Sequence, residues 1–203
     1  MAEGIKIEIF RMKNMDELTK ALADPDSRLE IGSGTASSAA LAASFLCRAA
    51  NLTAREVQGN ERVDFIVRNA ETLRKYMVHL IDEDVKARGP LRRALAEGGA
   101  REIEAARQPA ISISREIVNM MGQMLELAKE LASYCPQEGM HFLGACAELA
   151  LASMRAARCY IVDMADKCTD ETFRYINRRE NEIIINDAAA VAGELLAAVE
   201  EKI

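Results

Sequence analysis

The 203-residue chain contains no tryptophan, and aromatic residues make up only 4% of it. It has only 4 prolines and 11 glycines, which is little turn chemistry for a fold of many short strands. Half of the residues are hydrophobic, so alanine, leucine, isoleucine, valine and methionine must fill the core. Alanine has the highest helix propensity and lets helices pack closely. The composition therefore predicts an all-α protein, a helical bundle that forms a single domain over residues 1–203.

Disulfide pairs and export signals are also missing. The five cysteines are odd in number and form no CxxC pair, which indicates reduced thiols. The first residues contain neither the basic segment nor the apolar segment of a signal peptide. The most apolar tract, Ala39 to Cys47, is far too short to cross a membrane. We therefore expect a cytoplasmic protein with no membrane partner.

Positive charge is scarce as well. The formal net charge of −6 argues against a nucleic-acid partner, because affinity for phosphate backbones comes largely from Lys and Arg. One local basic stretch contains Lys86, Arg88, Arg92 and Arg93. Acidic residues flank this stretch, so a solvated helix face is the favoured interpretation.

Apolar residues recur at spacings of three and four, which is typical of amphipathic helices. The segments 36–50 and 142–164 are rich in small apolar residues, so we expect these two helices at the centre of the bundle. Residues 5–10 alternate apolar and polar and are compatible with a short strand, an extended arm or the start of a helix. The expected helices cover residues 16–23, 36–50, 63–85, 91–106, 109–131, 142–164 and 170 onward.

Helix boundaries follow from residues that stop or start a helix. Gly89-Pro90 should end the helix over 63–85, and Gly98-Gly99 should interrupt the next one. Pro109 fits the first turn of the following helix. Thr169 or Asp170 should cap the last helix.

The segment Gly32-Ser33-Gly34-Thr35 is the most informative local feature. Glycines permit a close backbone approach, and the N-terminus of the helix that follows offers free N–H groups and a positive dipole end. Such a loop suits a carboxylate or a phosphate. On spacing alone, a simple helix start capped by Ser33 or Thr35 is the favoured alternative. The segment is neither a Walker loop nor a dinucleotide fingerprint.

Acid–base chemistry could come from the acidic segment that ends the long helix. His79 lies one turn from Asp82 and Glu83, although a solvated face with a surface ion pair is the favoured reading for His79. Asp82 lies beside the apolar stripe that ends at Leu80 and Ile81. Desolvation there should raise the pKa of Asp82, while Asp84 should point away from the stripe.

His141 is the other histidine, and it stands between Cys135 and Cys146. These gaps match no familiar zinc pattern, so we expect no metal site. We also find no recognisable Ser–His–Asp arrangement.

Taken in order, these features resemble the cyclodeaminase/cyclohydrolase family of folate metabolism. The resemblance rests on the glycine-rich segment that opens a small-residue helix closing with Asn51-Leu52-Thr53, and on Leu80-Ile81-Asp82-Glu83-Asp84 at the end of a long helix. It continues through Pro109, the second Ala-rich helix and Asp170-Glu171-Thr172-Phe173. It spans residues 14 to 200, and the order of the motifs carries it rather than any one of them.

The resemblance implies an all-helical homodimer that binds tetrahydrofolate as substrate and uses no metal. The implied reactions are hydrolysis of 5,10-methenyltetrahydrofolate and cyclising deamination of 5-formimidoyltetrahydrofolate. The absence of a formiminotransferase domain favours the hydrolysis. By the resemblance, Gly32, Ser33, Gly34 and Thr35 would meet the ligand. Asp82, Asp84 and, as a substitute acid, His141 would be the catalytic candidates.

Several positions depart from the family pattern. Where the family usually has a Lys-rich stretch, this chain has residues 54–59. Where the family has a Ser-Asp pair, this chain has His141-Phe142. In place of two asparagines of the family pattern the chain has Tyr160 and Met164, and in place of an aromatic residue it has Arg88. These departures keep open an alternative: a helical dimer of the same fold that is non-catalytic or binds another ligand.

Overall fold

The computed structural model describes residues 9–203, which form helices and no strand. A short 3₁₀ turn, η1 (Phe10–Met12), precedes the first α-helix. The residues that we considered for a strand lie mostly outside the described part, and Phe10 belongs to η1. The α-helices are α1 (Met15–Ala23), α2 (Ile31–Glu56), α3 (Glu61–Glu97), α4 (Ala100–Ala110), α5 (Ser112–Ala132), α6 (Gln137–Asp166) and α7 (Glu171–Lys202).

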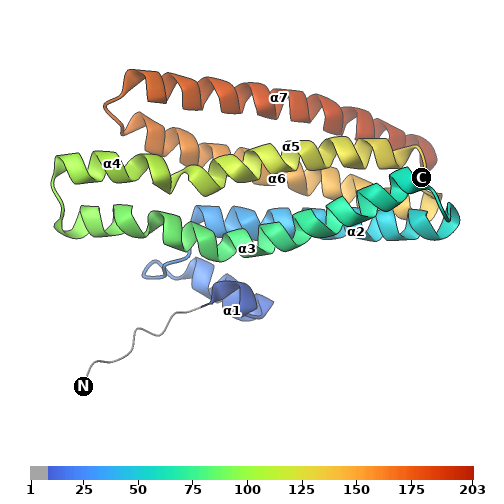
Figure 1. The fold of residues 1–203 in the computed structure, drawn as a ribbon, viewed down its shortest axis with the longest axis horizontal. Helices are drawn as coiled ribbons and strands as arrows, with labels where there is room; N and C mark the ends of the chain where they lie inside the picture. The colour runs from blue at the N-terminus through green and yellow to red at the C-terminus, as the bar shows by residue number, and fades with distance from the viewer. Residues whose placement is uncertain (1–8) are drawn as a thin grey trace.

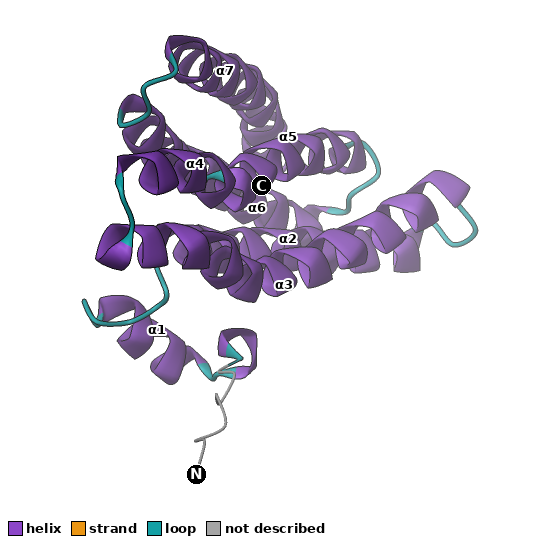
Figure 2. Ribbon diagram, turned by 60° about the vertical axis from the view of Figure 1, so that its left-hand side comes forward, coloured by secondary structure: helices purple, strands orange, loops and turns teal. Residues whose placement is uncertain are grey.

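The long helices lie roughly side by side in an elongated bundle, with α1 below it and α7 on the opposite side (Figure 1). Turning the molecule keeps α1 and α7 on opposite sides (Figure 2). Helix α2 packs against α3, α5 and α6, and α6 packs against α2, α5 and α7. Both helices bury small residues, such as Ala39 and Ala43 in α2 and Ala147 and Ala150 in α6. The predicted all-α bundle with two central small-residue helices is confirmed.

Two predictions about proline were wrong. Gly89-Pro90 does not end α3, which continues to Glu97. Pro109 lies in the last turn of α4 rather than the first turn of the next helix. The break falls instead at Gly98 and Gly99, whose extended backbones separate α3 from α4. A proline removes one intrahelical hydrogen bond, and the packing of a long helix can offset that loss.

Other helix ends match their sequence signals. Asp170 caps α7 by accepting a hydrogen bond from the Phe173 N–H at 3.0 Å, so Asp170 rather than Thr169 is the cap. Asn14 and Glu17 form a capping box at the start of α1. Within residues 9–203, no helix is both long and apolar enough to span a bilayer.

Candidate functional site

The glycine-rich segment is the first turn of α2 and not a loop before it. Helix α2 begins at Ile31, and its N-cap residue Glu30 makes no side-chain cap. Ser33 and Thr35 therefore lie inside the helix, so the prediction that one of them caps it was wrong. Both side chains are buried, and the Thr35 hydroxyl donates to the Gly32 carbonyl oxygen at 3.0 Å.

Asp84 from α3 closes over this turn. Its Oδ2 accepts a hydrogen bond from the Ser33 N–H at 2.9 Å and lies 3.0 Å from the Ser33 hydroxyl. The same hydroxyl lies 2.9 Å from the Ile81 carbonyl oxygen. A Cβ at position 32 would fall 2.0 Å from Asp84 Oδ1. Position 32 must therefore be glycine because the carboxyl group approaches the helix backbone so closely.

The Asp84 carboxyl group is wholly buried, and burial raises its pKa from 3.8 to about 6. The hydrogen bonds from Ser33 and the nearby Arg92 act in the opposite direction. Among the described residues, none offers a hydrogen bond to Oδ1. Asp84 is thus a buried carboxyl group that can gain or lose a proton near neutral pH and has one oxygen without a hydrogen-bond partner.

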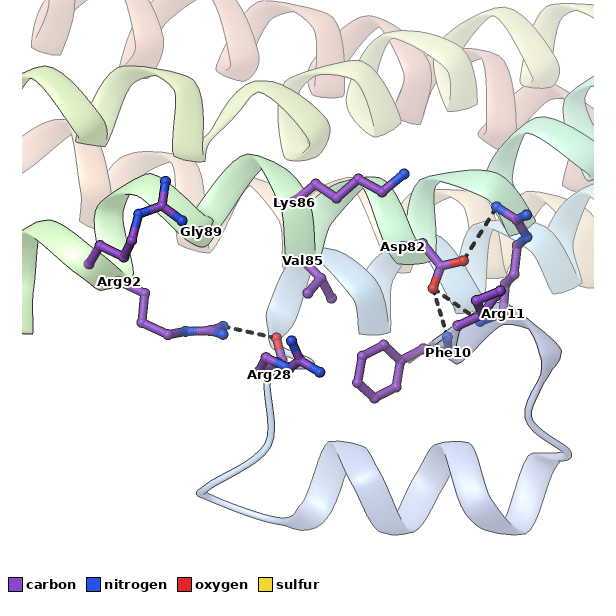
Figure 3. Close-up of a pocket in the computed structure, with 10 residues that line it drawn as sticks. Phe10, Arg11, Arg28, Asp82, Val85, Lys86, Gly89 and Arg92 are labelled. Atoms are coloured by element: carbon purple, nitrogen blue, oxygen red, sulfur yellow. Dashed lines mark hydrogen bonds and ion pairs between the residues drawn. The ribbon is translucent and has the colours of Figure 1, made fainter. Parts of the chain in front are cut away.

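Asp82 has a different environment. Its Oδ1 accepts hydrogen bonds from the backbone N–H groups of Phe10 at 2.8 Å and Arg11 at 3.3 Å, and its Oδ2 lies 3.3 Å from the Arg11 guanidinium (Figure 3). Asp82 therefore holds the N-terminal segment against α3. Our expectation that Asp84 points away from the core was wrong, because Asp84 is the more deeply buried of the two.

Arg88 lies one turn beyond Asp84 and is buried too. Its guanidinium forms an ion pair with Glu30 and lies 4.5 Å from the centre of the Tyr160 ring. Tyr160 is close enough to Arg88 and Asp84 for both to affect its pKa, which burial raises. At Arg88, then, the basic stretch is not the solvated face that we expected. Together, Ser33, Asp84, Arg88 and Tyr160 form a buried polar cluster shared by α2, α3 and α6.

Two cavities lie along the basic stretch. The first, about 630 Å³, contains Asp82 and Phe10 together with the basic residues Arg11, Arg28, Lys86, Arg92 and Arg93. Figure 3 shows Arg11 and Phe10 at one end of this cavity, Arg92 at the other and Arg28 between them. The second, about 350 Å³, is lined by Glu30, Arg88, Leu91, Arg92, Leu95, Arg107, Met164 and Lys167. Arg92 borders both cavities.

A model of the formiminotransferase-cyclodeaminase family matches residues 14–183. The chain belongs to this family. A crystal structure of formiminotetrahydrofolate cyclodeaminase from Thermotoga maritima has the same fold, with a TM-score of 0.86 and 18% sequence identity. The match covers 94% of this chain and 97% of that one. No curated protein matches the sequence.

His141 does not join the buried cluster of this formiminotransferase-cyclodeaminase family member. It is exposed beside Phe142, whose ring stacks on Phe45 in α2. Phe45 is twelve residues beyond Ser33, which corresponds to about 18 Å along a helix. Within one chain, therefore, the structure brings Asp84 together with Gly32 and Ser33 but places His141 beside the middle of α2, well away from them.

Neither histidine lies in a metal site. His79 is exposed, as we expected, and its Nε2 lies 3.4 Å from Glu83. Over residues 9–203 there is no group of three or more His, Cys, Asp or Glu side chains that could hold a metal ion.

Sequence reasoning missed Glu30 and did not connect Arg88 with Tyr160. The spacing of four between Asp84 and Arg88 places both on one face of α3, and this signal was available. The contact with Tyr160 joins residues 72 positions apart, and no local pattern reports such a contact. Arg88 and Tyr160 are two of the positions that differ from what the resemblance leads us to expect.

Proposed function

We propose that the protein catalyses proton transfer at the one-carbon unit between N5 and N10 of tetrahydrofolate, with Asp84 as the group that carries the proton. The observation that supports this role is the buried Asp84 carboxyl group, with a pKa of about 6 and an unoccupied Oδ1. A catalytic acid or base works best when its pKa lies near the working pH. Family membership and the name of the Thermotoga relative support the folate substrate.

Cyclising deamination of 5-formimidoyltetrahydrofolate is the first reaction proposed. N10 attacks the carbon of the formimidoyl group in its protonated amidinium form, and the ionised Asp84 takes the proton that N10 loses. The resulting tetrahedral carbon carries an amino group that must leave. Asp84 then donates the proton to this nitrogen, the C–N bond breaks, and ammonia departs to leave the methenyl bridge. One carboxyl group therefore serves as base and then as acid.

Hydrolysis of 5,10-methenyltetrahydrofolate requires the same two steps. Asp84 takes a proton from water as the water oxygen bonds to the methenyl carbon, and it then protonates the ring nitrogen as the bond from that nitrogen to the carbon breaks. The hydroxyl group on the carbon releases its own proton to solvent and becomes the formyl carbonyl. Both reactions begin with the ionised carboxylate. The same residue accordingly supports either reaction, and a direct assay of both substrates distinguishes them.

The first cavity suits the anionic end of a folate. Five basic side chains line it, and the only lining carboxylate among the described residues, Asp82, is occupied by backbone N–H groups and by Arg11. Glutamate carboxylates bind favourably to such a basic surface. In this proposal Gly32 and Ser33 act on the ligand indirectly, because they position Asp84. Gly34 lies under Leu22 of α1, and Thr35 is buried.

A homodimer remains part of the proposal. The surface between α2 and α6, here called the α2–α6 face, carries the exposed Leu41 and the half-buried Phe45, Phe142 and Leu149. Leu41 is 44% exposed, and the Phe45 and Phe142 rings stack with centroids 6.2 Å apart. An apolar patch of this kind favours association with a second copy.

The alternative of a changed ligand is supported by one observation. The resemblance leads us to expect an aromatic residue at position 88, whereas this chain has a buried cation there, Arg88. In this alternative the fold and the dimer remain, and turnover of both folates is absent.

The test is an assay of purified protein with each folate, following the methenyl absorbance above the uncatalysed rate. We expect Asp84→Asn to lower kcat/KM by about 10²- to 10⁴-fold, the usual contribution of an acid–base group. Asp82→Asn is the matched control and should retain activity to within about tenfold, because Asp82 lines the first cavity but its oxygens are already held by the backbone N–H groups of Phe10 and Arg11 and by the Arg11 guanidinium. If the wild type turns over neither folate, the proposed function is wrong; if Asp84→Asn is fully active, the assignment of Asp84 is wrong.

A further inference from the structure

The second cavity, between α3, α4 and α6, has a lining with an excess of positive charge. Arg88, Arg92, Arg107 and Lys167 line it, and Glu30 is the one acidic residue of residues 9–203 that does so. Glu30 serves two of these cations, since it forms an ion pair with Arg88 and lies 3.6 Å from Arg92. Arg107 and Lys167 have their own partners in Glu104 at 3.2 Å and Asp163 at 2.7 Å. One carboxylate shared by two guanidinium groups leaves room for a second anion.

Arg88 is the cation in this lining whose hydrogen bonds are incomplete. Only 9% of its side chain is exposed. Its Nε and Nη1 have no acceptor within the described part of the chain, and neither does the Tyr160 hydroxyl beside it. A guanidinium stays protonated when buried and has five N–H donors to satisfy. A buried cation that lacks acceptors is strongly stabilised by an oxyanion.

The rest of the lining is apolar. Leu91 is buried at the base of the cavity, Met164 contributes from α6, and Leu95 is 63% exposed at its edge. A small hydrated anion such as phosphate gains nothing from such a surface, whereas an apolar ligand body does. The volume of about 350 Å³ lies at the small end of the range for ligand sites.

We infer that this cavity binds a carboxylate attached to a flat apolar body, with Arg88 receiving the carboxylate and Leu91, Leu95 and Met164 contacting the body. The site does not depend on the proposed folate reaction, because Asp84 is not among the residues that line it. It gives the chain a specificity for aryl carboxylates that follows from the buried Arg88 and the apolar side chains that line the same cavity.

The probes are 2-naphthoate and its neutral isostere 2-naphthamide, with inorganic phosphate as the anion without an apolar body. Binding to the full-length protein is measured by isothermal titration calorimetry, supported by the shift in Tm. We expect 2-naphthoate to bind at least tenfold more tightly than either of the other two. Equal binding of naphthoate and naphthamide would overturn the role of Arg88, and equal binding of naphthoate and phosphate would overturn the apolar contact.

Two pairs of variants locate the site. Leu95→Glu places a negative charge at the exposed edge of the cavity and should weaken naphthoate binding at least tenfold, while Leu95→Gln should weaken it less than threefold. Arg88→Gln should abolish the preference for naphthoate over naphthamide, whereas Arg62→Gln, on the distant surface between α3 and α5, should not change it. Equal affinities of the two Leu95 variants, or an unchanged preference in a folded Arg88→Gln protein, would refute the site. The Leu95 pair decides the question if Arg88→Gln does not fold, because residue 95 is on the surface.

Discussion

Gly32 and Asp84 are in contact, and no room is left for a side chain at position 32. A Cβ there would lie 2.0 Å from Asp84 Oδ1, whereas a Cβ at Gly34 would lie 3.6 Å from Leu22, an ordinary contact distance. We expect Gly32→Ala to lower the free energy of unfolding by about 1–3 kcal/mol, the usual cost of overpacking. Gly34→Ala should leave it unchanged or raise it by up to about 1 kcal/mol, because alanine is the better helix former. Urea unfolding checks both; equal effects of the two substitutions would contradict the contact.

Burial of Asp84 should also make stability depend on pH. Its pKa is raised from 3.8 to about 6 in the fold, so the folded state holds the proton more tightly than the unfolded state. The carboxyl group therefore costs nothing below about pH 4 and destabilises the fold increasingly up to and above pH 6. The full cost is about 3 kcal/mol. We expect the stability of Asp84→Asn relative to wild type to increase by about this amount between about pH 4 and about pH 7. A constant difference in urea unfolding across this range would contradict the buried ionisation.

At this scale the sequence predicted which residues matter better than how they are arranged. It selected Gly32, Ser33, Asp82 and Asp84 because glycines at a helix start and carboxylates at a helix end are local patterns. It predicted that Asp82 would be the more buried carboxylate, whereas Asp84 is the more buried one. The prediction failed because the partner of each carboxylate is distant in the chain. Asp82 meets Phe10, 72 residues away, and Asp84 meets Ser33, 51 residues away.

Helix α3 is an element whose length is set by packing rather than by its breaker residues. It passes through Pro90, which has no N–H to offer the carbonyl four residues earlier. We expect Pro90→Ala to raise the free energy of unfolding by about 1–3 kcal/mol, since it restores that hydrogen bond and removes a ring clash. Pro25→Ala is the control, because Pro25 lies in the turn before α2 and should give no stabilisation. Thermal unfolding of both variants decides, and a destabilised Pro90→Ala would mean that the proline is needed where it stands.

Elements with long periodic patterns were predicted well, and their ends less well. Spacings of three and four identified the cores of α2, α3, α5, α6 and α7. The helix ends at Gly98-Gly99 and Asp170 were predicted correctly, because glycine pairs interrupt helices and aspartate caps them through local interactions. The start of α2 was placed several residues late, since glycine and serine suggest a loop unless a side chain from another helix, here Asp84, is known to pack on them.

At the scale of the whole molecule, we propose that the α2–α6 face packs against the same face of a second copy of the chain. We expect the wild type to be a dimer at micromolar concentration by light scattering, and Leu41→Glu to shift it toward monomer. Ile183→Glu is the matched control, because Ile183 in α7 is similarly exposed, at 45%, but lies away from this face. A monomeric wild type, or dissociation by the Ile183 substitution alone, would refute the face.

The fold and the folate proposal meet at one group, the carboxyl of Asp84. If the ionised carboxylate begins the reaction, kcat/KM for the folate substrate should fall below about pH 6, with a single titrating group on the acidic side. The pH dependence of kcat/KM is therefore the most direct test. The account predicts this acidic limb in the wild type and in Asp82→Asn, and its loss in any residual activity of Asp84→Asn. An acidic limb that stays unchanged in Asp84→Asn would contradict it.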